Sequence, residues 1–209
     1  MIANMLSVRR SLEHANEKRR EMEKANERLL EKSETDPLTR LANRFRLNDY
    51  LERAFERTRD DHRAFAVEIL DIDYFKEYND NYGHQAGDAC IVAIADELRK
   101  MQSHGTFCAR YGGDEFIIIY EYKTEDEVFS MADSLRERIL DRRIEHVCSK
   151  ALPVVTISQG ICFDVAPEGS RSWDFLHAAD MMLYEVKKRS RNNISLGHLD
   201  AKEARYGEE

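Results

Sequence analysis

The amino-acid sequence predicts an α/β protein with a sheet of mixed strand directions, preceded by a long N-terminal helix. Three features of the 209 residues favour this class. Residues 1–32 contain neither proline nor glycine, and farther on short apolar runs alternate with amphipathic segments of helical period. A Gly-Gly pair also separates two of the apolar runs. Such alternation along one chain is typical of a sheet covered by helices.

The N-terminal segment, residues 1–32, is rich in Glu, Lys, Arg, Ala and Leu, which is the composition of a helix. A seam with alternating spacings of four and three, as in a heptad repeat, comprises Met1, Met5, Val8, Leu12, Ala15, Arg19, Met22, Asn26 and Leu29. The polar residues Arg19 and Asn26 occupy core positions, which lowers stability but can fix register and partner number. We expect a parallel homodimeric coiled coil, with a single solvated helix as the alternative.

The rest of the chain predicts a helix and strand order that begins after a junction at residues 33–37. Pro37 disfavours helical backbone at Asp36 and so marks this junction. Gly83 and Gly87 are expected to bracket a turn before a helix. The expected helices cover residues 43–59, 74–81, 86–101, 128–144 and 172–189, and the expected strands cover residues 64–70, 106–110, 116–120 and 154–161, with a short one near Ile194.

Two acidic clusters lie at the ends of strand-like segments. Asp71 and Asp73 follow a buried apolar run, at the point where α/β sheets tend to hold ligands. Asp114 and Glu115 directly follow the Gly-Gly pair. This pair is expected to form a tight hairpin, because glycine reaches positive φ without a Cβ clash. Two unit charges about 4 Å apart repel by roughly 4 kcal/mol at an effective dielectric near 20. If the fold joins the clusters, a cation must lie between them, and Mg²⁺ takes carboxylate oxygens together with substrate phosphates.

Four separated motifs carry a resemblance to a known family. They occupy residues 36–44, 71–88, 112–116 and 179–192, and the third reads Gly-Gly-Asp-Glu-Phe. Together they resemble the GGDEF family of diguanylate cyclases over about residues 36–196. The resemblance implies a palm-like fold of the nucleotidyl-cyclase type, with a central, mostly antiparallel sheet flanked by helices. The domains expected from it are an N-terminal signalling helix at 1–35, a GGDEF catalytic domain at 36–197 and a polar tail at 198–209.

The resemblance implies that two GTP molecules condense to cyclic di-GMP and two pyrophosphates. Asp71, the Ile72 carbonyl and Asp114 match the family's metal ligands, and Glu115 matches a second-metal or hydroxyl-activating position. Two Mg²⁺ (or Mn²⁺) ions per half-site would neutralise the triphosphate and help to deprotonate the 3′-hydroxyl. Asp73 has a structural alternative, as a cap on the next helix. One domain holds one GTP, so two half-sites must meet, and the N-terminal homodimer would raise their local concentration.

Phosphate recognition is expected from the basic residues of two motifs. Lys76 is a point charge suited to a triphosphate terminus or a charged transition state. The backbone N–H groups of Tyr74 and Phe75 would add donors if they open a helix. Lys187 and Arg191 lie four residues apart, so one helical face or its end could present both to the phosphates. A solvated basic helix end, favoured by the helix dipole, is the alternative for this pair.

Guanine recognition matches Asn79 and Asp88. An aspartate that accepts hydrogen bonds from the guanine N1–H and N2–H₂ groups would reject adenine, which leaves the acid unpaired. His84 is a candidate substrate contact, with a turn-stabilising histidine as the alternative.

Composition limits the partners and the compartment. The net charge of −8 argues against a nucleic-acid backbone as partner. No apolar run approaches the ~20 residues of a membrane-spanning helix, and no signal-peptide pattern opens the chain. We expect a cytoplasmic protein, or the cytoplasmic part of a larger one whose sensor or receiver domain lies outside this chain. The cysteines are expected to be small core residues in a reducing compartment, and they are Cys90, Cys108, Cys148 and Cys162.

The chain departs from the family pattern at several positions. Residues 103–106 read Ser-His-Gly-Thr where many members carry an Arg-x-x-Asp product-inhibition site, so we expect no feedback inhibition through that site. Arg40 and Ser190 stand where glycine is common, and Gln159 stands where an aliphatic residue is usual. Glu68 lies within a strand without an evident partner, and the alternatives are that it faces solvent or that it pairs with a nearby arginine.

Two other functions remain open on the sequence alone. One is a catalytically silent module that binds GTP or cyclic di-GMP and signals through its N-terminal helix. The other is a purely structural dimerisation protein, which would leave both acidic clusters without a use.

Overall fold

The computed structural model describes residues 17–20 and 34–199. The chain divides into two units, Met1–Glu34 and Thr35–Glu209. In the first unit, residues 17–20 are helical. The rest of the predicted coiled coil, and with it the predicted dimer contact, lies outside the described residues.

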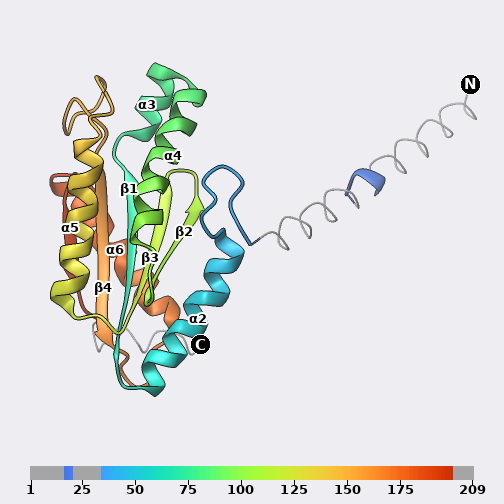
Figure 1. Cartoon of the computed structure of the whole chain (residues 1–209), viewed down its shortest axis with the longest axis vertical. Helices are drawn as coiled ribbons and strands as arrows, with labels where there is room; N and C mark the ends of the chain where they lie inside the picture. The colour runs from blue at the N-terminus through green and yellow to red at the C-terminus, as the bar shows by residue number, and fades with distance from the viewer. Residues whose placement is uncertain (1–16, 21–33, 200–209) are drawn as a thin grey trace, which may run out of the picture. The chain divides into compact units, whose positions relative to one another are not determined.

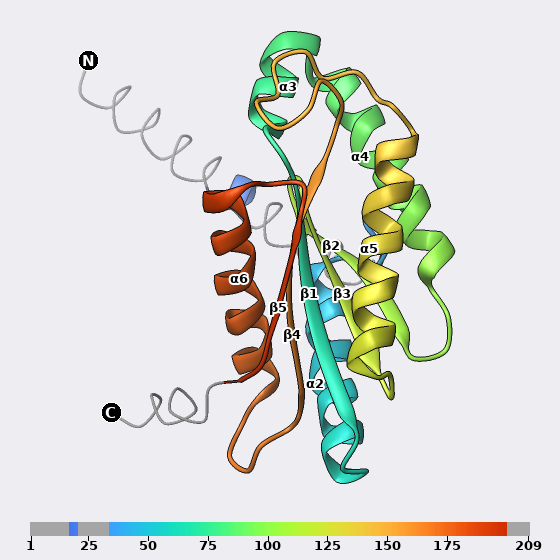
Figure 2. The same cartoon turned by 90° about the vertical axis from the view of Figure 1, so that its left-hand side faces the viewer.

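In the second unit, five strands form one sheet in the order β2-β3-β1-β4-β5 (Figure 1, with β5 labelled in Figure 2). The strands are β1 (Ala64–Ile72), β2 (Thr106–Gly112), β3 (Glu115–Glu121), β4 (Ile157–Val165) and β5 (Ile194–Gly197). The helices are α2 (Arg44–Asp60), α3 (Phe75–Tyr82), α4 (His84–Met101), α5 (Glu125–Asp141) and α6 (Ser172–Arg189). All neighbouring strands pair antiparallel except β4 and β5, which are parallel. The predicted mostly antiparallel sheet flanked by helices is confirmed.

Helices cover both faces of the sheet, and the central strand β1 is therefore buried on both sides. Figure 2 shows α6 on one side of the sheet and the α4–α5 pair on the other. Along β1, Ala66 and Leu70 pack into the core beneath α4 and α5. Val67 and Ile69 pack into the core beneath α2 and α6. Because side chains alternate along a strand, Asp71 continues the second series and faces the α6 side.

Two elements, α5 and β4, begin three residues from their predicted starts, each for a local reason. The helix α5 begins three residues before the predicted start because Thr124 caps it: Thr124 Oγ1 accepts a hydrogen bond from the Glu127 N–H at 3.3 Å, and the Glu127 carboxylate accepts one from Thr124 N at 2.7 Å. The strand β4 begins at Ile157 rather than 154, since Val154 forms an isolated bridge with Glu145 instead of joining the sheet.

The expectation of a turn bracketed by two glycines was wrong at Gly87. Gly83, with φ of 83°, separates α3 from α4, which begins at His84. Gly87 lies inside α4, where a Cβ atom would meet Asn79 Oδ1 at 1.9 Å. This glycine therefore permits the close approach of α3 to α4.

The cysteine prediction holds for Cys90, Cys108 and Cys162, which are buried and free, whereas Cys148 is exposed. Among the described helices, none is both long and apolar enough to cross a membrane.

Candidate functional site

The two acidic clusters meet at one end of the sheet. Antiparallel pairing places Asp71 of β1 directly opposite Glu115 of β3. Directly paired residues project from the same face of a sheet, with Cβ atoms about 5 Å apart. Asp114 lies in the turn between β2 and β3, next to Gly113, whose φ of 54° fits the predicted glycine hairpin. The strand-end aspartate and the hairpin acids thus form one acidic site.

Lys187 of α6 supplies a positive charge to this site. Its Nζ lies 2.7 Å from Asp71 Oδ2. Burial raises the pKa of Asp71 to about 7; the Lys187 ammonium opposes this rise, whereas the charges of Asp114 and Glu115 add to it. The three acids are therefore close enough to influence one another, and Lys187 neutralises part of their negative charge.

Glu115 is half-buried, and its surroundings raise its pKa above the ordinary value. Burial raises its pKa, Lys187 opposes this, and the negative charges of Asp114 and Asp180 raise it again. Beside Glu115, a hollow of about 310 Å³ extends to Asp180 and Trp173 of α6. A glutamate with a raised pKa beside open space can accept a proton from a bound hydroxyl group.

Arg110 holds the hairpin in place, a role that the sequence did not reveal. Its Nε and Nη2 donate hydrogen bonds to the Gly113 carbonyl at 3.1 and 2.7 Å, and its Nη1 donates to Asp36 Oδ1 at 3.1 Å. Although burial pushes the pKa of Asp36 up, hydrogen bonds from Thr39 and Arg110 bring it below the ordinary value. The only signal for this contact in the sequence was the place of the two residues relative to the motifs. Asp36 begins the motif at 36–44, and Arg110 lies two residues before the motif at 112–116.

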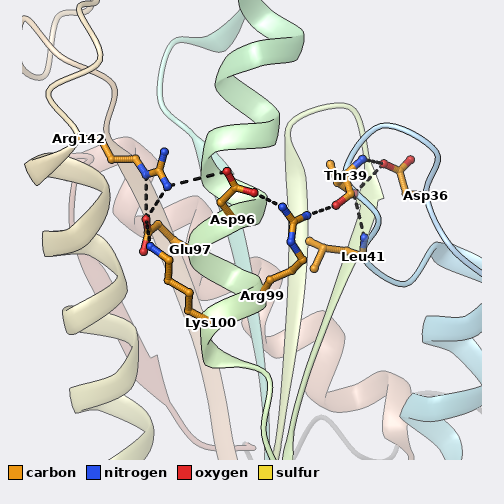
Figure 3. A network of polar contacts seen from close by, with 8 residues as sticks. All are labelled: Asp36, Thr39, Leu41, Asp96, Glu97, Arg99, Lys100 and Arg142. Carbon is orange, nitrogen blue, oxygen red and sulfur yellow. Dashed lines mark hydrogen bonds and ion pairs between the residues drawn. The ribbon is translucent and has the colours of Figure 1, made fainter.

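A chain of polar contacts extends from Asp36 across α4 (Figure 3). Thr39 donates to Asp36 Oδ1 from its N–H at 2.8 Å and from its hydroxyl at 2.7 Å. Arg99 of α4 contacts both the Thr39 carbonyl and Asp96. Arg142 directly follows α5, and its Nη2 lies 4.0 Å from Asp96 Oδ2. The loop that supports the hairpin is thus connected to both helices on the far face of the sheet.

The alternative role of Asp73 as a cap on the next helix is wrong. The N-cap of α3 is Tyr74, which makes no side-chain cap. The Asp73 carboxylate instead accepts hydrogen bonds from the hydroxyl groups of Thr156 and Ser158, at 2.7 and 2.6 Å. Thr156 directly precedes β4, and Ser158 is the second residue of that strand. It also accepts one from the Asn192 N–H at 3.0 Å. Asp73 is a buried tether between three segments.

The residues predicted to bind phosphate lie around the same end of the sheet as Asp71. Tyr74 and Phe75 form the start of α3, directly after β1, and Lys76 is exposed on its first turn. Arg191 follows the end of α6, and its guanidinium group stacks over the Tyr74 ring, 4.3 Å from the centroid. Lys187 of α6 therefore contacts the end of β1, and Arg191, just after α6, contacts the start of α3.

The residues predicted to bind guanine meet where α3 and α4 pack. Asn79 lies over Gly87, and its Oδ1 is buried without a hydrogen-bond partner in the described part of the chain. Asp88 is the next residue of α4 and is exposed, as is His84 at the start of that helix. The exposed Asp88 carboxylate is open to a ligand that presents N–H groups, whereas Asn79 Oδ1 is enclosed against Gly87.

The acidic site fits a divalent cation that shares its ligands with a substrate. Asp71 and Asp114 supply carboxylate oxygens, and the Ile72 carbonyl is the next backbone acceptor. Across residues 17–20 and 34–199, no three acidic, histidine or cysteine side chains are already arranged as a metal cage. Mg²⁺ is commonly held by one or two carboxylates with phosphate oxygens, so an incomplete protein cage is what a nucleotide-dependent site requires.

The partner of Glu68, which the sequence left open, lies beneath α5. Glu68 accepts hydrogen bonds from the Tyr120 hydroxyl at 2.6 Å and from Gln159 Nε2 at 2.7 Å. Gln159 Nε2 also donates to the Ala132 carbonyl of α5 at 3.0 Å. The two unusual residues, one on β1 and one on β4, are therefore partners of each other.

Comparison with known proteins agrees with these features. The family described as "Diguanylate cyclase, GGDEF domain" matches residues 33–193. Diguanylate cyclase DgcP of Pseudomonas aeruginosa is 35% identical over 167 residues, which cover 79% of this chain and 24% of that protein. Diguanylate cyclase DgcP of Escherichia coli is 30% identical over 170 residues, 81% of this chain and 49% of that protein. This chain thus spans about a quarter of the first relative and about half of the second.

A solved structure shares the architecture as well. The coiled coil and GGDEF domain of DgcB from Caulobacter crescentus, in complex with c-di-GMP, superposes with a TM-score of 0.73 at 28% identity and covers 91% of this chain and 100% of that one. The match over residues 33–193 includes the whole acidic site, from Asp71 to Glu115 and Lys187. The chain belongs to the GGDEF domain family of diguanylate cyclases.

Proposed function

We propose that this protein is a diguanylate cyclase that condenses two GTP molecules to cyclic di-GMP and two pyrophosphates. In each half-reaction the 3′-oxygen of one nucleotide forms a bond to the α-phosphorus of the other, pyrophosphate leaves, and the hydroxyl proton passes to a base. The observation that carries the proposal is the pairing of Asp71 with Glu115, with Asp114 and Lys187 beside them. Membership of the GGDEF family supports the same activity.

Two divalent cations, Mg²⁺ or Mn²⁺, are proposed for each half-site. Asp71, the Ile72 carbonyl and Asp114 would hold one, and Asp114 with Glu115 would serve the other. When bound, such ions neutralise a triphosphate and lower the pKa of a coordinated hydroxyl group. As an alternative to binding the second cation, Glu115 is proposed to receive the hydroxyl proton, because its raised pKa makes it a stronger base than an ordinary glutamate.

The basic residues are proposed to bind the triphosphate. Lys76 on the first turn of α3 can reach a terminal phosphate, and the N–H groups of Tyr74 and Phe75 point from a helix start that attracts anions. Lys187 would contact both Asp71 and the phosphates, while Arg191 stands beside Tyr74. Positive charge would then surround the reacting phosphorus from α3 and from α6.

Guanine is proposed to bind between α3 and α4. The Asp88 carboxylate would accept hydrogen bonds from the donor edge of guanine, and Asn79 would join it by turning its amide out from Gly87. His84 lies at the start of the same helix as Asp88. Adenine lacks two adjacent donors on that edge and would leave Asp88 unpaired.

Catalysis is proposed to require two copies, because the described domain carries one set of these residues. The N-terminal helix would hold the homodimer, and a sensor or receiver in a longer cytoplasmic protein would control it. The proposed absence of product inhibition rests on Ser103 and Thr106. Their backbones form a mutual bridge, with Thr106 N donating to Ser103 O at 3.0 Å, and neither side chain carries a charge.

The test is to incubate the full chain with GTP and MgCl₂ and to measure pyrophosphate and cyclic dinucleotide by mass spectrometry. We expect both products with GTP and neither with ATP, and we expect Asp114→Asn to abolish synthesis. A chain that binds GTP without turnover would be the silent binding module. A chain that binds neither GTP nor cyclic di-GMP would be a structural protein.

A further inference from the structure

Asp73 is one of the most fully engaged carboxylates of the described chain, although the proposed chemistry does not use it. It is 1% exposed. Its Oδ1 accepts from Ser158 Oγ at 2.6 Å, and its Oδ2 accepts from Thr156 Oγ1 at 2.7 Å and from Asn192 N at 3.0 Å. Arg191 Nε lies 3.9 Å from Oδ1. A buried acid needs such donors to remain in place.

The segment that Asp73 holds has an unfavourable backbone conformation. Arg191 and Asn192 have φ of 51° and 44°, so two consecutive residues other than glycine lie in the left-handed region. Such residues persist only where surrounding contacts enforce them, and they concentrate at functional sites. The next residue, Asn193, is held to β4, because its carbonyl accepts a hydrogen bond from the Gln159 N–H at 3.0 Å. On the two strained residues themselves, the backbone hydrogen bonds are the Arg191 N–H to the Val186 carbonyl at 3.0 Å and the Asn192 N–H to Asp73. Only the second of these comes from outside the α6 segment.

The same contacts determine where Arg191 lies. Its guanidinium group stacks on Tyr74, the residue directly after Asp73, at 4.3 Å from the ring centroid. Asp73 is also two residues from Asp71, and its own N–H donates to the Thr156 carbonyl at 2.9 Å. One side chain therefore connects the acidic end of β1, the strand β4 and the segment that carries Arg191.

We propose that Asp73 is a positioning residue, which fixes the Arg191 segment against the end of β1 and so sets the phosphate-binding arm relative to the acidic site. The proposal rests on the proposed function in one respect, namely that Arg191 contacts nucleotide phosphate. Asp73 itself contacts no reacting atom. Its role is to keep Arg191 in a conformation that the backbone alone would not adopt.

The first test needs no substrate and uses trypsin, which cleaves after arginine. In the full chain, the tethered segment should resist cleavage between Arg191 and Asn192. Asp73→Ala should increase the cleavage rate there by about tenfold or more, because it removes a charge-assisted hydrogen bond. Asp73→Asn keeps an oxygen that can accept from the Asn192 N–H and should retain most of the protection. Equal cleavage rates in all three proteins would refute the tether.

The matched control is Glu121→Gln. Glu121 is also buried, 5% exposed, and bonded to Tyr50 at 2.5 Å and Arg57 at 2.8 Å, but it lies at the other end of β3 from Glu115. It should leave cleavage after Arg191 unchanged. If Asp73→Ala does not fold, slow hydrogen exchange of the Asn192 amide in the unchanged chain still supports the tether, and rapid exchange refutes it.

The second test measures the affinity for a non-hydrolysable GTP analogue with MgCl₂ by calorimetry. Asp73→Ala should weaken binding by about tenfold, and it should add little when Arg191 is already alanine. Additive effects of the two substitutions on affinity would refute the positioning role of Asp73 without contradicting the proposed cyclase activity. If the chain without substitutions has no cyclase activity, the proposed function is refuted instead. The proteolysis result would still test whether Asp73 tethers the Arg191 segment.

Discussion

Lys187 Nζ and Asp71 Oδ2 lie 2.7 Å apart, so α6 and β1 are joined by an ion pair at the acidic site. Lys187 is partly exposed and Asp71 is largely buried, which makes the lysine the neutralising charge for an otherwise costly carboxylate. The same lysine is proposed to bind phosphate. Metal and nucleotide would therefore enter a site in which the position of the acid is already set by a cation.

The first prediction concerns the pH dependence of metal binding. A metal ligand must be ionised, and the pKa of Asp71 in the metal-free chain is raised to about 7. Mn²⁺ affinity should therefore fall as the pH is lowered through 7. Lys187→Gln removes the charge that opposes the rise, so it should move this midpoint to higher pH. Mn²⁺ binding followed by electron paramagnetic resonance between pH 5.5 and 8.5 checks both shifts. Arg189→Gln, which removes a surface ion pair with Glu185, is the control and should not move the midpoint.

The second prediction concerns stability and the buried Glu68. It is 0% exposed, and burial raises its pKa to about 7, although the donors Tyr120 and Gln159 oppose this. Because its folded-state pKa lies above the unfolded value, the protonated form stabilises the fold at low pH. That stabilisation is lost as the pH rises through 7. The difference between about 7 and the ordinary 4.5 corresponds to at most about 3 kcal/mol.

Glu68→Gln removes this ionisation while it keeps the shape of the side chain. The variant should gain free energy of unfolding relative to the unchanged chain between pH 5 and pH 8, as measured by urea titration. Gln159→Leu should destabilise the chain by about 1–3 kcal/mol, because Glu68 loses a donor in the core. A difference between Glu68→Gln and the unchanged chain that is constant with pH would contradict the assignment.

The sequence predicted the helices and strands because they have local signals, and the resemblance to the GGDEF family implied that the acids converge. Asp71 ends an apolar run, and the glycine pair permits the hairpin that brings Glu115 opposite it. The remaining contacts join positions far apart in the chain. Glu68 meets Gln159 at a separation of 91 residues, and Asp73 meets Asn192 at a separation of 119. No periodicity or spacing encodes such pairs, so the partner of Glu68 and the role of Asp73 required the tertiary structure.

The third prediction separates the two positions at which the chain lacks the family's usual glycine. Arg40 has φ of 61°, a conformation that favours glycine, whereas the φ of Ser190 is −139°. Arg40→Gly should stabilise the chain by about 1 kcal/mol, since relief of left-handed strain exceeds the added entropy of the unfolded chain. Ser190→Gly has no such strain to relieve and should be neutral or slightly destabilising. Thermal unfolding of both variants decides the matter; equal effects would show that backbone strain at Arg40 is unimportant.

The fourth prediction concerns the N-terminal segment. If its heptad seam holds two domains together, the full chain should keep a constant specific activity as the protein is diluted. In a chain without residues 1–30, specific activity should instead fall in proportion to the protein concentration as the protein is diluted, because each productive encounter becomes bimolecular. Activity against dilution and the molar mass from light scattering test this. A shortened chain that is monomeric yet has unchanged specific activity would contradict the coupling.

The last prediction uses Gly87 to test how the guanine site is built. Alanine in the interior of a helix is ordinarily better than glycine by about 1 kcal/mol. At Gly87, however, the new Cβ would lie 1.9 Å from Asn79 Oδ1 and 3.3 Å from Phe75 Cζ. Gly87→Ala should therefore displace the Asn79 side chain, destabilise the chain and reduce the preference for GTP over ATP. In a chain that already carries Asn79→Ala, the same substitution meets only the milder Phe75 contact and should be neutral or stabilising. Urea unfolding of the four proteins measures this reversal of sign. If Gly87→Ala has the same effect in both backgrounds, the close approach of α3 and α4 at this glycine does not position Asn79.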